Sequence, residues 1–256
     1  MASNRIVVNT GVGATSCFST RLHDAIAYHR QHGKYPAIID SAQQFTLFRD
    51  YTGQDVASLV FGEYKPNDNL EFVSYSHDWQ YCWYDEIHIK QLAALARMIC
   101  PLSSHIGNRA YNYARDAQDK LIERTAVLYR GNDKALEIPR TNYEAMIEMA
   151  IESKSEKFIV QTDEQEFFDY FKERFPDTVA FDNIPRISKN PDGYVMTPVG
   201  QRVDFLLNFI GALYVISECD KLILNTGNTG IWTVLFRGHI NNVWQYNSKF
   251  NAHKKL

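Results

Sequence analysis

A cluster of charged side chains follows the strand-like run 125–129, with the sequence Arg130-Gly-Asn-Asp133-Lys134-Ala-Leu-Glu137. In an open parallel sheet, ligands bind beyond the carboxyl ends of the strands, which is where these groups fall. An arginine there can contact two oxygens of a diphosphate, and a carboxylate can accept the proton of an attacking hydroxyl group. The pattern therefore predicts a diphosphate contact for Arg130 and a base among the nearby carboxylates Asp133 and Glu137, with a solvated turn of local ion pairs as the alternative.

Two further loops join a strand-like run to a helix-like run and are rich in Gly, Thr and Asn. Backbone N–H groups at a helix N-terminus, together with flexible glycines, form a ready site for an anion. A tight turn explains the first loop equally well, and a plain helix cap explains single residues of the second. The residues predicted to bind an anionic ligand are Gly11, Val12 and Gly13 in the first loop and Asn225, Thr226, Gly227, Asn228 and Thr229 in the second.

The elements that must position these loops alternate between strand and helix patterns in two blocks. A right-handed crossover helix links neighbouring parallel strands, so each block predicts a parallel sheet. We expect strands at 5–9, 37–40, 125–129, 157–161 and 221–224, and helices at 17–32, 85–99, 105–123, 142–153, 164–175, 201–219 and 229–236. The fold class is therefore α/β, with two Rossmann-like domains facing across a cleft. The expected domains are 1–124 and 125–240, followed by a C-terminal tail, 241–256.

Composition and missing motifs exclude several function classes. Lys and Arg number 27 against 30 Asp and Glu, so no basic field exists to attract nucleic acid. The longest apolar stretch, 209–216, is far shorter than the roughly 20 residues of a membrane span, and the four cysteines are widely spaced. We therefore expect a cytoplasmic protein with no transmembrane segment. The sequence contains no Asp-x-Asp, P-loop or Gly-x-Ser-x-Gly, which predicts no divalent metal and disfavours nucleoside triphosphatases and α/β-hydrolases.

Weaker features leave alternatives open. Ser16 stands where a dinucleotide fingerprint needs its third glycine, so a Rossmann oxidoreductase is not supported. His29 and His32 share a helix face but lack a third metal ligand at a suitable spacing. An aromatic cluster could stack on sugar rings, pack in the core or form a homodimer surface. Its members are Tyr75, Trp79, Tyr81, Trp83 and Tyr84.

The charged segment, the loops and their order resemble the fucosyltransferase superfamily of GT-B architecture. This group contains core α-1,6-fucosyltransferases, nodulation-factor fucosyltransferases and protein O-fucosyltransferases. Arg130-Gly-Asn-Asp133-Lys134 resembles the family's Arg-Arg-Thr-Asp-Lys, and the end of 157–164 resembles its Ala-Thr-Asp-Asp. Phe181-Asp182-Asn183 is similar to its Ser-Asp-Asn, and 216–229 to its Leu-Ser-x-Ala-Asp-x-x-Val-x-Thr-x-Ser-Ser run. The resemblance covers roughly residues 125–240 and, only loosely, the first forty.

The resemblance implies an enzyme that moves a sugar from a nucleotide diphosphate-sugar to a glycan hydroxyl. The implied transfer inverts the configuration at the sugar carbon and needs neither a divalent metal nor a cofactor. By this resemblance Arg130 contacts the β-phosphate, and Asn225 to Thr229 surround the pyrophosphate. Asp163 and Asp182 lie near the nucleoside, so the resemblance makes 125–240 the nucleotide-sugar-binding domain and 1–124 the acceptor-side domain. Asp133 or Glu137 is the base, and Lys134 adds a supporting charge.

Two departures from the family pattern keep the donor open. One arginine stands where many relatives have two, and Thr226-Gly-Asn-Thr229 replaces the Ser-Ser pair. The donor could thus be GDP-fucose, another GDP-sugar, or a UDP-sugar such as UDP-xylose. The rival hypothesis is a catalytically inactive nucleotide- or carbohydrate-binding protein of the same fold. The short chain without an anchor suits a cytosolic glycan pathway of a microbe or of a virus-infected cell.

Overall fold

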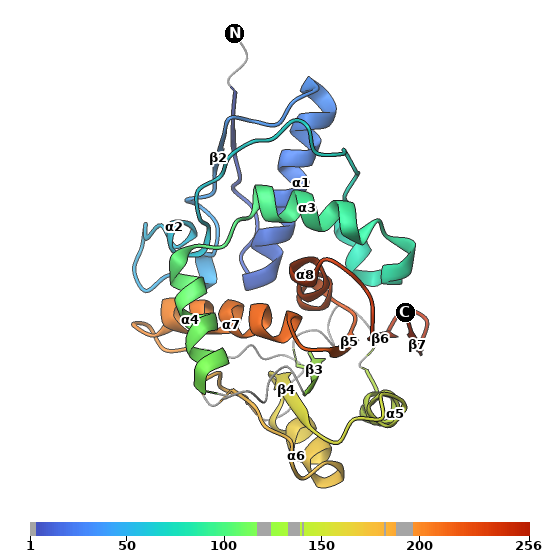
Figure 1. Ribbon diagram of the computed structural model, residues 1–256. Coiled ribbons are helices and arrows are strands. Elements are labelled where there is room, and N and C mark those ends of the chain that lie inside the picture. Colours follow the sequence, from blue (N-terminus) through green and yellow to red (C-terminus); the bar gives the residue numbers. More distant parts are fainter. Residues whose placement is uncertain (1–3, 117–123, 133–138, 140, 182, 188–196) are drawn as a thin grey trace.

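The computed structural model describes residues 4–116, 124–132, 139, 141–181, 183–187 and 197–256 (Figure 1). The first elements are strand β1 (Arg5–Val7), helix α1 (Ala14–His32) and strand β2 (Ile38–Asp40), and β1 pairs with β2 in parallel. This confirms the predicted strand–helix–strand unit. Helix α1 begins three residues before its expected start, directly after the loop glycines. It is capped at its carboxyl end by Gly33, which adopts the left-handed conformation (φ 69°).

Short helices connect this unit to two longer ones. The order is η1 (Thr46–Phe48), α2 (Ala57–Val60), η2 (His77–Tyr81), η3 (Tyr84–Glu86), α3 (Ile89–Ile99) and α4 (Ser104–Asp116). In the aromatic cluster, Tyr75 and Tyr84 are buried in the main core and Trp79 packs against it. The packing interpretation is therefore confirmed for Tyr75 and Tyr84.

The second sheet has the strand order β4-β3-β5-β6-β7 in the described part of the chain. Its parallel strands are β3 (Thr125–Tyr129), β4 (Phe158–Thr162), β5 (Lys221–Asn225) and β6 (Val243–Asn247), and β7 (Ala252–Lys255) runs antiparallel to β6. The prediction of a C-terminal tail was wrong, because residues 241–256 supply β6 and β7. Strand β6 is buried although it carries two amides: Gln245 accepts from Tyr84 N at 3.0 Å, and Asn247 donates to Tyr81 O at 2.9 Å.

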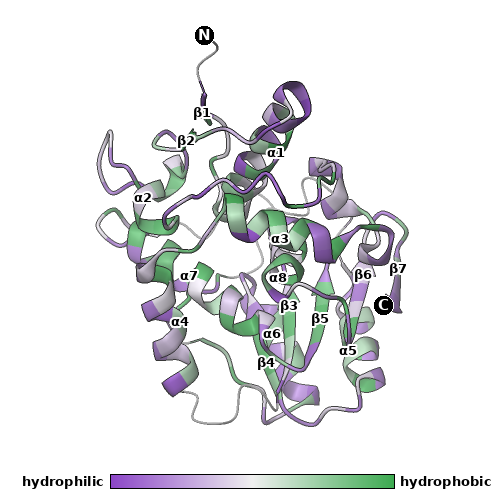
Figure 2. Cartoon of the chain, turned by 45° about the horizontal axis from the view of Figure 1, so that its top comes forward, coloured by the Kyte–Doolittle hydropathy of each residue, from purple (hydrophilic) through white to green (hydrophobic). Residues whose placement is uncertain are grey.

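Helices cover both faces of this sheet (Figure 1). Helices α5 (Tyr143–Glu152) and α6 (Gln165–Arg174) pack on one face, and α7 (Arg202–Ser217) and α8 (Asn228–Arg237) pack on the other. Successive strand residues point to opposite faces, so Ala126 and Leu128 join one core while Val127 and Tyr129 join the other. In Figure 2, strands β3, β4 and β5 are mostly green, that is hydrophobic, whereas the helices around them also carry purple, hydrophilic stretches.

The N-terminal half packs on the α7 and α8 side. Buried residues of α1 and α3 belong to the same continuous core as those of α7 and α8. Helices α4 and α7 approach closely at Gly211, where an added Cβ would lie 2.8 Å from the Cβ of Arg109. The α/β fold class with two facing units is thereby confirmed, while the boundary at 124/125 stays a prediction.

Candidate active site at the carboxyl ends of β3 and β5

The strand order reverses next to β3, because β4 lies on one side of it and β5 on the other. Such a switch point opens a crevice beyond the carboxyl ends of the two strands. The side chain of Asn225 spans it: its Oδ1 accepts from Arg130 N at 3.2 Å, and its Nδ2 donates to Arg130 O at 3.0 Å and to Thr141 Oγ1 at 3.2 Å. The ends of β3 and β5 are therefore held in register at the place where a ligand would bind.

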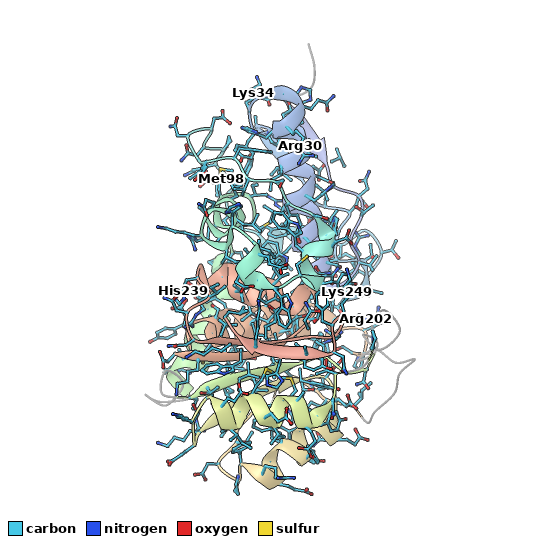
Figure 3. All side chains as sticks on the ribbon, turned by 90° about the vertical axis from the view of Figure 1, so that its right-hand side faces the viewer. Arg30, Lys34, Met98, Arg202, His239 and Lys249 are labelled. Atoms are coloured by element: carbon cyan, nitrogen blue, oxygen red, sulfur yellow. The ribbon has the colours of Figure 1, made fainter. Side chains whose placement is uncertain are left out.

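A cavity of about 480 Å³ opens at this switch point. Its wall combines both halves of the chain. It is lined by Val12–Ser16, Thr46–Phe48, Leu128, Arg130, Gln161–Asp163, Ile184, Pro185, Thr197, Arg202, Phe205, Phe209 and Asn225–Gly230. In Figure 3, Arg202 lies on the same side of the view as Lys249, which follows the carboxyl end of β6. The cavity is large enough for a small organic substrate.

Two helix N-termini meet at this cavity. Helix α1 begins after Gly13 and helix α8 after Gly227, and both glycines line the cavity. Thr15 Oγ1 lies 3.4 Å from Thr229 Oγ1, so the first turns of the two helices are in contact. The first backbone N–H groups of a helix lack acceptors within the helix and carry partial positive charge. The wall therefore presents two groups of such donors to an anion.

The polar side chains of the second loop are largely engaged inside the fold. Thr226 Oγ1 donates to Tyr246 O at 3.0 Å and accepts from Ser248 N at 2.9 Å, while Asn228 Oδ1 accepts from Ser19 Oγ at 2.9 Å. These bonds fix the shape of the loop. What the loop offers a ligand is then mainly the backbone N–H groups at the start of α8.

Asp163 holds the charged segment after β3 in place. The Nε of Arg130 lies 3.2 Å from Asp163 Oδ2, and Gly131 N donates to Asp163 Oδ1 at 3.1 Å. Asn132 Nδ2 donates to Asp163 O at 3.0 Å. The side chain of Asp163 is 10% exposed against 29% for Arg130, so the carboxylate lies beneath the guanidinium. Arg130 thus reaches the cavity as a positioned cation that is paired with the carboxylate of Asp163.

Comparisons with known proteins were made at the levels of sequence and structure. No family model matches the chain, and no curated protein sequence matches it. The chain does match solved structures. One of them is fucosyltransferase NodZ from Bradyrhizobium, which is 13% identical in sequence and superimposes with a TM-score of 0.59. The match covers 96% of this chain and 97% of the NodZ chain. The chain has the fold of this fucosyltransferase. NodZ α-1,6-fucosyltransferase soaked with GDP-fucose gives a TM-score of 0.62 at 14% identity, covering 98% of both chains. The same enzyme co-crystallised with GDP gives a TM-score of 0.58 at 13% sequence identity, covering 96% of both chains.

The fucosyltransferase fold extends over more of the chain than the sequence motifs indicated. The motifs covered roughly residues 125–240, whereas the structural match includes nearly the whole N-terminal half. The predicted GT-B resemblance is confirmed at the level of fold.

The structure brings together most of the predicted binding residues. Val12, Gly13, Arg130, Asp163 and all five residues from Asn225 to Thr229 line the one cavity. Gly11 is not among the lining residues. It adopts φ +93°, and an added Cβ would lie 3.0 Å from the Cα of Cys17, so Gly11 serves the turn itself. Asp133, Lys134, Glu137 and Asp182 lie outside the described residues.

Sequence reasoning missed the wall that α7 and η1 contribute. Arg202 lines the cavity from the first turn of α7, and the rings of Phe205 and Phe209 stack along that helix with centroids 6.1 Å apart. Phe48 of η1 stacks on Phe205 at the same centroid distance. An amphipathic helix pattern cannot show which residues face a cavity formed with a distant segment. The sequence therefore carried no signal for this wall.

Two observations concern the thiol nearest the first loop and the metal-ligating residue types in the described part of the chain. Cys17 lies behind the first loop, and burial raises the pKa of its thiol to about 12, so it stays protonated at neutral pH. In the part of the chain that the structure describes, no group of three or more His, Cys, Asp or Glu is arranged to hold a metal ion. The same residues include no helix long and apolar enough to cross a bilayer.

Proposed function

We propose that this protein is a glycosyltransferase that takes a sugar from a nucleoside diphosphate donor and attaches it to a hydroxyl group of a glycan. The observation that carries the proposal is the meeting of two helix N-termini and Arg130 at one cavity beside the β3/β5 switch point. This arrangement suits a diphosphate. The similarity in fold to an enzyme crystallised with GDP and GDP-fucose supports the same class of donor.

The proposed reaction forms one bond and breaks one. The acceptor oxygen attacks C1 of the donor sugar while the bond from C1 to the β-phosphate oxygen breaks. The nucleoside diphosphate leaves with the bonding electrons, and the acceptor proton passes to a carboxylate, for which the sequence offers Asp133 or Glu137. Negative charge grows on the leaving phosphate, so Arg130 and the N–H groups of α8 would stabilise the transition state more than the ground state.

Three finer features of the reaction belong to the proposal. Inversion at C1 is proposed from the resemblance in sequence motifs alone, and NMR of the anomeric proton in the first product tests it. Metal independence fits a site where arginine and helix N-termini face the anion, and full activity in EDTA tests it. The donor sugar stays open between GDP-fucose, another GDP-sugar and a UDP-sugar.

The main experiment is a donor screen with the purified chain. We expect release of GDP or UDP from one donor, slow with water and faster with a glycan mixture, and Arg130→Gln should abolish it. Arg174→Gln is a matched control, because Arg174 lies on the outer surface of α6 and is half exposed. Donor binding without turnover would favour the inactive binding protein. Absence of binding to any nucleoside diphosphate would refute the proposal.

A further inference from the structure

Arg202 is the second arginine in the cavity wall, and its guanidinium is held by backbone oxygens. Its Nε donates to Thr197 O at 3.2 Å, and its Nη1 contacts Arg49 O at 3.4 Å. Thr197 itself lines the cavity, and Arg49 follows the lining residue Phe48. The guanidinium is therefore fixed between two segments of the wall by groups that do not neutralise its charge.

The charges of the cavity wall do not balance without a ligand. The charged residues among the described lining are Arg130, Asp163 and Arg202. Asp163 forms an ion pair with Arg130. Among the described residues, no carboxylate forms an ion pair with the Arg202 guanidinium, and Asp50 bonds its backbone N instead. The net positive charge of this wall therefore rests on Arg202.

A carboxylate from the N-terminal half fixes the helix that carries Arg202. The N-cap residue of α7, Gln201, provides no side-chain cap. Asp50 does so instead, because its Oδ1 accepts from Gly200 N at 2.6 Å and from Arg202 N at 3.1 Å. A cap of this kind orders the first helical turn, so it limits the positions open to the Arg202 side chain.

We propose that Arg202 binds the diphosphate of the donor and supplies the second positive charge of the site. The inference rests on the proposed function. A nucleoside diphosphate-sugar brings one negative charge on each phosphate, while Arg130 is already matched by Asp163. The Arg202 guanidinium, which backbone oxygens hold in the wall of the same cavity, provides a further positive charge from a different element, α7.

Calorimetric titration with four ligands separates this role from a structural one. The ligands are inorganic pyrophosphate, the preferred nucleoside diphosphate, its monophosphate and its nucleoside. A lost charge-assisted contact costs about 1.5–3 kcal/mol, so we expect Arg202→Gln to weaken diphosphate and pyrophosphate binding by about 10- to 100-fold. The monophosphate should lose less and the nucleoside nothing. Arg202→Lys should recover part of the affinity, and the wild-type dependence of Kd on salt should become shallower in Arg202→Gln.

The matched control is Arg109→Gln. Arg109 lies on helix α4 outside the cavity lining, and its side chain pairs with Asp204 of α7. Thermal unfolding of each variant establishes that it is folded. Equal diphosphate affinity in wild type and Arg202→Gln would overturn the assignment while leaving the proposed function intact. An effect confined to the KM for the glycan would also overturn it, by moving Arg202 to the acceptor. Failure of the wild type to bind any nucleoside diphosphate or pyrophosphate would overturn both proposals.

Discussion

The bridge that Asn225 makes between β3 and β5 leads to a quantitative prediction. Asn225 is 2% exposed, and replacing it by Ala removes its hydrogen bonds to Arg130 N, Arg130 O and Thr141 Oγ1. At about 1 kcal/mol for each bond, the free energy of unfolding should fall by about 3 kcal/mol. The cause is structural, since these groups lose their partner whether or not a ligand is present.

Asn228 provides the control within the same loop. Its side chain accepts one hydrogen bond, from Ser19, so Asn228→Ala should cost only about 1 kcal/mol. Urea unfolding followed by circular dichroism measures both variants without substrate. If the Asn225 variant lost less than the Asn228 variant, Asn225 would be a ligand residue rather than a bridge, and the account of the switch point would be wrong.

Four further predictions concern the site and its support. Arg130→Gln should remove transfer by at least about 100-fold with a melting temperature close to wild type, measured by donor turnover and calorimetry. Asp50→Ala should lower the free energy of unfolding by about 1 kcal/mol through the lost cap of α7, and denaturant titration tests this. Gly230→Ala should cost about 1–3 kcal/mol because its Cβ would lie 2.7 Å from both Asn225 O and Tyr84 Oη; an unchanged melting temperature would contradict this. Burial raises the pKa of Cys17, Cys100 and Cys219 from 9.0 to about 12, so the folded state keeps these protons longer than the unfolded state. The contribution of these three protonated thiols to the free energy of unfolding should be complete below pH 9 and decline as the pH rises toward 12. Urea titrations at pH 8 and pH 10 test this, and the free energy of unfolding should fall less between these pH values in a Cys17→Ala variant than in wild type.

The regular elements could be predicted because their sequences have clear periodicity and end signals. Strand β3 has the predicted bounds, β4 is shifted by one residue at both ends, and β5 extends one residue further at its carboxyl end. These strands are apolar because helices bury both of their faces. Their loops follow directly, so the alignment of Arg130 with Asn225 at one sheet edge could be expected from the sequence.

Features that depend on distant partners could not be predicted in this way. Strand β6 contains Gln245 and Asn247, which resemble loop residues until their partners at Tyr81 and Tyr84 are known. Arg202 is one polar residue at a helix start, and its role depends on a wall formed with η1. The hydroxyl of Thr226 was expected at a ligand and instead bonds the β6 segment. In each case the deciding neighbour is at least 20 residues away.

The contacts between α1 and α8 also limit how often the two halves of the chain can part. Ser19 donates to Asn228 at 2.9 Å and accepts from Trp232 Nε1 at 2.8 Å, and Thr15 meets Thr229. A hinge motion that parted the two halves at this line would break these bonds at about 1 kcal/mol each, which amounts to about 3 kcal/mol. Such an open state would be populated by fewer than about one molecule in a hundred. The closed arrangement of the two halves should therefore predominate at equilibrium, and an open state should be reached only transiently.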